Sequence, residues 1–292
     1  MDNGKNVLRV CKNSFLKWKG NLRVLIVFLL LAVLLFYSTA GARRLAVEQN
    51  LAVTPWIFPF LFGVPFNRIL FFLPLIFLFS DAPFFDEQFP YLCMRSSRSV
   101  WAKGELLYIA ASSLLFTLAL YVFSVLFFIP YLGFSMDWGK ILRMLSMGSA
   151  MSMEFTETYA SGIFIKPEIL TSYSPLAATL LSVLIVWCLC MFLGLVMFVL
   201  NLRFPRGVGA AAASLLVCFS FFASQFMHGT RAGMIFYFSP VSWSNLADIQ
   251  MGTELRPPLG YVIGALLVLI AVLSLLAAFL IKHKDIEVLP EV

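Results

Sequence analysis

The chain has 292 residues, of which 61% are apolar and only 12% are charged, and its mean hydropathy is +0.92. That much apolar surface exceeds what a water-soluble domain of this length can bury, so the composition excludes an ordinary soluble protein. The composition predicts a polytopic membrane protein, and despite the formal net charge of +6 no nucleic-acid partner is expected.

Long runs without charge mark the predicted membrane spans, because a hydrocarbon core of about 30 Å needs roughly 20 helical residues to cross it. None of the runs alternates polar and apolar residues as a membrane barrel would, so the predicted fold class is all-α, with residues 1–292 forming a single transmembrane domain. Six spans are predicted, at residues 22–41, 58–80, 105–130, 174–200, 207–227 and 259–281, with a cytoplasmic loop at 81–104 and outer segments at 131–173 and 228–258.

Residues 5–20 are predicted to form an amphipathic helix that lies in the membrane interface before the first span. A cleaved signal peptide is the alternative, with an apolar run at 24–37 and small residues at "STAGA". The long, patterned basic region favours the interfacial helix. On a helical wheel the apolar arc holds Val7, Leu8, Val10, Cys11, Phe15 and Trp18, and the opposite arc holds Arg9, Lys12, Asn13, Lys17 and Lys19, with Leu16 as the misfit.

The distribution of Lys and Arg predicts the orientation, because positive charge is retained on the inner side during insertion. With the N-terminus inside, the inner segments hold thirteen of these residues, and the outer segments, including 42–57 between the first two spans, hold seven over a greater length. Both termini are therefore expected in the cytoplasm, and the protein is expected in a cell membrane as a multi-pass protein of a bacterial plasma membrane.

Arg68 falls near the middle of the second predicted span. An arginine in the membrane is costly and is by default a functional candidate, so Arg68 is a candidate for the translocation path. Two structural alternatives remain open. Pro59, Pro65 and Pro74 could break the helix and bring Arg68 nearer the outer surface, or Arg68 could pair with a backbone carbonyl at such a break.

The predicted cytoplasmic loop combines positive charge with apolar side chains. Arg95, Arg98 and Lys103 would be explained by topology alone, since basic inner loops are what insertion requires. The same loop, however, contains "DAPFFDEQFPYLCMRSSRSVW", whose aromatic residues, Met and Arg are typical of protein-binding surfaces. The loop is therefore predicted to bind a cytoplasmic partner.

Sequence motifs for catalysis, nucleotide binding and metal binding are missing. The only histidines, His228 and His283, are predicted on opposite sides of the membrane, which argues against an HExxH zinc site or a His-based triad. Neither GxSxG nor GxxxxGK[ST] occurs. The chain is not expected to be an enzyme or to hold a cofactor or metal, and any energy for transport would have to come from another subunit.

Two stretches of the loop carry a family resemblance. "SDAPFFDE" is an acidic-apolar turn, and "YLCMRSSRSVWAKGELLY" follows with two arginines, an aromatic residue and a glycine that opens the third span. Together with the basic N-terminal helix and six spans, this pattern resembles the membrane subunits of ABC exporters of the type-2 (ABC-2-like) class. The resemblance implies a coupling helix that contacts a separate ATPase, and a segment around "FYFSPVSW" that partly re-enters the outer leaflet near the exit. The residues expected to dock the ATPase are Phe89, Tyr91, Arg95, Arg98, Trp101 and Glu105.

The function expected from this sequence is that of a permease subunit that exports a hydrophobic or amphipathic substrate, such as a lipid, peptide or drug. Its expected partners are an ABC ATPase subunit in a separate chain, a second permease copy or a related permease, and membrane lipids. The alternative is a membrane scaffold or accessory protein without transport activity, whose loop recruits a cytoplasmic partner.

Overall fold

The computed structural model describes residues 3–84, 97–151, 153–205, 207–226, 232–249 and 256–283. These residues form helices and turns, and extended pairing among them is limited to one backbone bridge between Val53 and Leu132. The helices are α1 (Asn3–Leu16), α2 (Leu22–Ser38), α3 (Ala40–Gln49), α4 (Phe58–Leu61), α5 (Pro65–Leu78), α7 (Arg98–Leu126), α8 (Gly139–Met151), α9 (Met153–Tyr159), α10 (Pro167–Ser172), α11 (Pro175–Arg203), α12 (Val208–Phe226), α13 (Ala232–Ile235) and α14 (Leu259–Lys282), and the short 3-10 helices are η1 (Ile129–Tyr131), η2 (Phe236–Phe238), η3 (Pro240–Ser244) and η4 (Leu246–Asp248).

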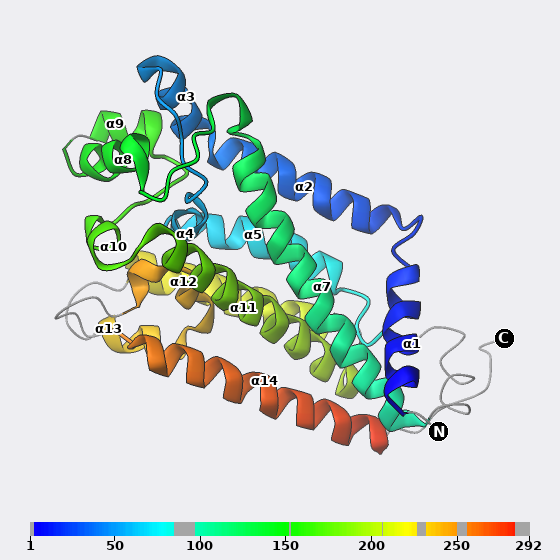
Figure 1. The fold of residues 1–292 in the computed structure, drawn as a ribbon. Coiled ribbons are helices and arrows are strands. Elements are labelled where there is room, and N and C mark those ends of the chain that lie inside the picture. Colours follow the sequence, from blue (N-terminus) through cyan, green and yellow to red (C-terminus); the bar gives the residue numbers. More distant parts are fainter. Residues whose placement is uncertain are drawn as a thin grey trace.

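The long helices form a bundle with two distinct ends (Figure 1). Helix α11 packs against α7, α12 and α14, and α2 packs against α5 and α7. At one end α1 crosses the bundle and packs on the start of α7, close to the last turn of α14. At the other end α3 packs on α8 and α9, and α10 packs on α8. These ends are called the α1 end and the α8 end below.

Four helices are long and apolar enough to cross a membrane, namely α7, α11, α12 and α14. The number rises to five if α2 and α3, which are bent by 46° at a short break, form one span. This all-helical architecture is compatible with a membrane-embedded protein. Helix α5 has 14 residues and a length of about 21 Å, which is shorter than a hydrocarbon core. Six crossings and the side of each terminus therefore stay predictions.

The predicted second span, 58–80, is interrupted between α4 and α5. Val64 has extended backbone angles (φ −79°, ψ 118°) because it precedes Pro65, and proline disfavours the helical conformation of the residue before it. Pro65 itself occupies the first turn of α5, where its missing N–H costs nothing. The third span also differs from its prediction: α7 begins at Arg98, so the end of the expected loop is helical.

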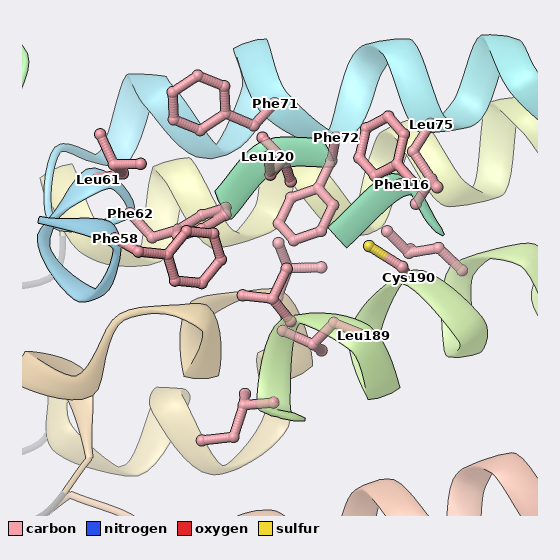
Figure 2. Close-up of a cluster of buried hydrophobic side chains, with 14 of the residues drawn as sticks. Phe58, Leu61, Phe62, Phe71, Phe72, Leu75, Phe116, Leu120, Leu189 and Cys190 are labelled. Carbon is pink, nitrogen blue, oxygen red and sulfur yellow. The ribbon is translucent and has the colours of Figure 1, made fainter. Parts of the chain in front are cut away.

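Aromatic side chains fill the centre of the bundle (Figure 2). Phe62, after α4, makes an edge-to-face contact with Phe71 of α5, with ring centroids 5.6 Å apart. Inside a bilayer, helices associate through close van der Waals packing rather than through exclusion of water, so such interlocking rings fix the helix positions. The members labelled in Figure 2 come from the α4–α5 region, α7 and α11, and they are Phe58, Leu61, Phe62, Phe71, Phe72, Leu75, Phe116, Leu120, Leu189 and Cys190.

Both long connecting segments carry structure of their own. Residues 131–173 contain α8, α9 and α10. In 228–258 the described residues 232–249 form α13 and η2–η4, and η3 packs on α11, α12 and α14. Trp243 in η3 is 1% exposed, and its Nε1 donates to the Phe236 carbonyl at 2.7 Å. This segment is therefore anchored in the bundle.

A charged turn precedes α8. The Arg143 guanidinium donates to both oxygens of Asp137, at 2.9 and 2.8 Å, and the Trp138 backbone N–H donates to the same carboxylate at 2.9 Å. The backbone N–H and the guanidinium lower the pKa of the Asp137 carboxyl below its ordinary value. Both charged side chains are exposed, so this ion pair stabilises only the local turn.

Candidate functional site

The predicted docking residues divide into two groups. Phe89, Tyr91 and Arg95 lie outside the described residues. Arg98, Trp101 and Glu105 occupy the first two turns of α7, at the α1 end, and each makes a different contact with the rest of the bundle.

Arg98 lies on the surface and joins two helices. Its Nη1 donates to the Lys282 carbonyl in the last turn of α14, at 3.3 Å. A cation at the C-terminus of a helix also interacts favourably with the helix dipole. Of the three described docking residues, Arg98 is the most exposed, although it is partly buried.

Trp101 and Glu105 are both 2% exposed, so in this conformation they contact the chain itself. The Trp101 ring is stacked on Phe198 of α11, with centroids 6.2 Å apart and an interplanar angle of 30°. The Glu105 carboxylate accepts a hydrogen bond from Ser14 Oγ of α1 at 2.9 Å. The beginning of α7 thus contacts α11 through stacked rings and α1 through a hydrogen bond.

Helix α1 is seated closely on α7. A Cβ atom added at Gly104 would lie 2.5 Å from Val10 Cβ, so the absence of a side chain permits this approach. Trp18, just beyond α1, donates from Nε1 to the Tyr108 hydroxyl at 2.8 Å. Burial, and then the nearby Glu105 carboxylate, raise the pKa of the Cys11 thiol on the same face of α1. The amphipathic N-terminal helix therefore buries one face in the bundle.

The second candidate site surrounds Arg68, at the α8 end. Arg68 is 1% exposed and lies in the first turn of α5, directly after the break. Its Nε donates to the Phe62 carbonyl at the break, at 3.1 Å, and its Nη1 donates to Ser224 Oγ of α12 at 2.8 Å. Its Nη2 forms an ion pair with Asp248 of η4. Both structural features considered for Arg68, the helix break and the carbonyl partner, are present together with this ion pair.

Asp248 is shared between two arginines. Its Oδ2 pairs with Arg68, and its Oδ1 accepts from Arg256 Nη1 at 2.9 Å. Arg256 also donates to the Ala247 carbonyl and lies over the Phe236 ring at 5.1 Å. A charge removed from water is tolerated only when it is paired and hydrogen-bonded, and this arrangement satisfies both conditions. We call Arg68, Asp248 and Arg256 the ion cluster.

The ion cluster joins parts of the chain that are far apart in sequence. Arg68 and Asp248 are separated by 180 residues, and Ser224 comes from a third element. Lys166, before α10, reaches the same region and donates to the Ala247 carbonyl at 3.4 Å. The cluster therefore holds η4 against α5 and α12.

Sequence reasoning found Arg68 but missed Asp248, Arg256 and Ser224. The signal available for Asp248 was a single carboxylate in the otherwise uncharged stretch from 232 to 249. Among the described residues no three His, Cys, Asp or Glu side chains gather as metal ligands.

No protein-family model, no curated protein and no solved structure matches this chain. Its function is therefore argued from its own residues and geometry.

Proposed function

We propose that this chain is the membrane permease subunit of an ATP-binding cassette exporter, and that a separate ATPase subunit drives it. In this proposal the chain crosses the membrane six times with both termini in the cytoplasm. Two permeases, identical or related, enclose the path of a hydrophobic or amphipathic substrate. The observation that carries the proposal is the joined packing at the α1 end, where α1, α7, α11 and α14 meet beside the loop expected to bind the ATPase.

That packing provides a mechanical route from the loop into the bundle. The last part of the predicted loop is the beginning of α7, and within two turns α7 contacts α14 through Arg98, α11 through Trp101 and α1 through Glu105. A displacement of the loop would therefore move four helices together. ATP binding would act by favouring the closed ATPase pair and, through it, one of two packings of the spans.

The ion cluster is the part of the proposed mechanism that lies at the α8 end. It ties the 232–249 segment to α5 and α12, so this segment is closed over the bundle in the conformation described here. In the outward-open state the segment would have to separate from α5, which would expose Arg68 and Asp248 to water or to the substrate path. This is the basis for keeping Arg68 as a translocation-path residue.

The experiment is purification of the full-length protein from its native host through a C-terminal tag, with mass spectrometry of co-purifying proteins and a measurement of ATP hydrolysis. The proposal expects a stoichiometric ATPase that is lost in the double variant Arg95→Glu, Arg98→Glu. Arg203→Glu is the matched control, because Arg203 is an exposed cation at the end of α11, at the same end of the bundle but outside the loop.

Three outcomes separate the possibilities. Loss of the ATPase in the loop variant but not in the control supports the exporter and its docking surface. Equal loss in both variants would indicate general electrostatic attraction rather than a docking site. Recovery of a stoichiometric cytoplasmic partner that hydrolyses no ATP would favour the scaffold and overturn the exporter.

A further inference from the structure

A cavity of about 670 Å³ lies beside the last turns of α7, at the α8 end of the bundle. Its walls come from α7 and the residues directly after it, from 55–56, and from 132–136. We call it the α7 cavity and define it by Trp56, Tyr121, Val122, Leu126, Phe134 and Met136. Its volume falls in the range of about 300–1,000 Å³ that is typical of sites for drug-sized molecules. The described residues of the ion cluster lie outside it.

Hydrogen bonds between the two segments hold the walls of the α7 cavity in place. The Val53 backbone N–H donates to the Tyr131 carbonyl at 2.7 Å, and the Gly133 N–H donates to the Val53 carbonyl at 2.9 Å. Trp56 Nε1 donates to the Ser135 carbonyl at 2.7 Å, across a separation of 79 residues in the sequence. The cavity is therefore preformed, and a ligand that enters it does not have to order its walls.

The side chains that line the α7 cavity select an uncharged ligand. Leu132, Phe134 and Met136 alternate along an extended stretch, and this spacing places all three on the cavity side. In the described part of the chain no charged side chain lines the cavity. An ion that entered would lose its hydration without gaining a counter-charge. An apolar molecule meets no such penalty.

The α7 cavity is open along the outer face of α7. Val122, Leu126 and Ile129 follow helical spacing on this face and are 50%, 45% and 61% exposed. At the rim, Phe134 is 87% exposed and Met136 is 81% exposed. Large apolar side chains that gather around one opening mark a binding surface. Because α7 is long and apolar enough to cross a membrane, a molecule dissolved in the bilayer can reach the cavity from the side.

We infer that the α7 cavity binds an uncharged apolar molecule of drug size, which enters beside α7 and is covered by Phe134 and Met136. Methionine adapts to varied apolar shapes, so the cavity should accept a class of molecules rather than a single compound. The inference does not depend on the proposed transport function, because it concerns equilibrium binding to this chain without ATP or an ATPase.

The test is a binding titration of the delipidated full-length protein in amphipol with N-phenyl-1-naphthylamine, an uncharged fluorescent probe. Energy transfer from tryptophan, Trp56 included, reports probe bound to the protein, and amphipol without protein corrects for partitioning. Phe134→Ala should weaken saturable binding roughly tenfold, because the bound probe loses the apolar contact of one phenyl ring. The matched control is Phe238→Ala, which removes a 78% exposed phenyl ring in η2, outside the cavity. Both rings are exposed in the protein, so neither variant disturbs the core.

A second probe and a blocking variant complete the test. The probe 8-anilinonaphthalene-1-sulfonate has the same rings and an added sulfonate, and it should bind at least about tenfold more weakly because its charge finds no partner in the cavity. Val122→Trp places an indole in the open side and should abolish saturable binding. Equal affinities in Phe134→Ala and Phe238→Ala, or a sulfonate probe that binds as tightly as the uncharged one, would overturn the inference. Saturable binding that survives in Val122→Trp, or no saturable binding in the unmodified protein, would overturn it as well.

Discussion

Removal of Asp248 should destabilise this protein more than removal of either arginine that it contacts. In Asp248→Asn, two guanidiniums remain close together without the carboxylate that neutralised them, and Arg68 is only 1% exposed. Removing one partner of a buried ion pair costs about 3–5 kcal/mol, because the remaining charge stays desolvated and unpaired. We expect Asp248→Asn to fall in this range.

The two arginine variants should rank below it. Arg68→Met leaves Asp248 paired with Arg256, so its cost should lie at the lower end, at about 3 kcal/mol. Arg256→Met should cost about 1 kcal/mol, because the Arg256 side chain is 20% exposed and solvent already screens its interaction. The order expected from the structure is therefore Asp248→Asn, Arg68→Met and Arg256→Met.

Thermal unfolding in detergent, followed with a thiol-reactive fluorophore, measures this order directly. Cys11 and Cys190 are buried and become reactive as the bundle opens. The double variant Arg68→Met, Asp248→Asn should be less destabilised than the sum of the single variants, because the two side chains share one interaction. Additive effects, or a midpoint for Asp248→Asn equal to that of the unmodified protein, would refute the assignment of Asp248 as the shared counter-ion.

Three further predictions concern the contacts around this framework. Gly104→Ala should displace α1, because the added Cβ would lie 2.5 Å from Val10. Limited proteolysis should then cut the N-terminal segment faster than in the unmodified protein. Gly260→Ala is the control, because its Cβ meets nothing within 4 Å and the cleavage rate should not change. Trp101→Ala should lower the free energy of unfolding by about 3–5 kcal/mol in the same thiol assay, since it leaves a large cavity between α7 and α11. The protection factor of the amide hydrogens in the turn before α8, which corrects for the intrinsic slowing of exchange in acid, should fall as the pH drops through the lowered pKa of Asp137. A depressed carboxyl pKa stabilises the fold only while the group is ionised, so Asp137→Asn should show the low protection factor at every pH.

The long apolar helices were predictable from the sequence because the chemistry leaves few alternatives. An uncharged run in a membrane must satisfy its own backbone hydrogen bonds, and α11, α12 and α14 begin and end within a few residues of their predicted spans. The interruption before α5 was one of the alternatives left open in the sequence, and it occurs at Pro65 and not at Pro74. Helix α7 extends past its prediction because Arg98 and Lys103 were assigned to the loop by charge alone.

The partners of the candidate residues were much less predictable. An arginine in an apolar run is easy to recognise in the sequence, but the sequence does not show which carboxylate will form an ion pair with it. Asp248 comes 180 residues later, and the contact is produced by the way η3 and η4 fold back onto α11 and α12. Trp101 shows that burial is equally hard to predict. In the sequence it stands in a charged, aromatic stretch typical of an exposed surface, and only the path of α7 turns it toward Phe198.

The two ends of the bundle are held by different forces, and this difference constrains any conformational change. At the α1 end the contacts are close packing at Gly104 and ring stacking at Trp101, which a small rigid-body shift of α7 can carry along without breaking. At the α8 end the ion cluster has no partly formed state of similar energy, because separating Asp248 from Arg68 leaves both charges desolvated unless water enters. Any motion that detaches η4 from α5 must therefore hydrate the cluster or supply a new counter-charge. An apolar molecule cannot supply a counter-charge, so any opening at this end is expected to admit water, which would then solvate Arg68.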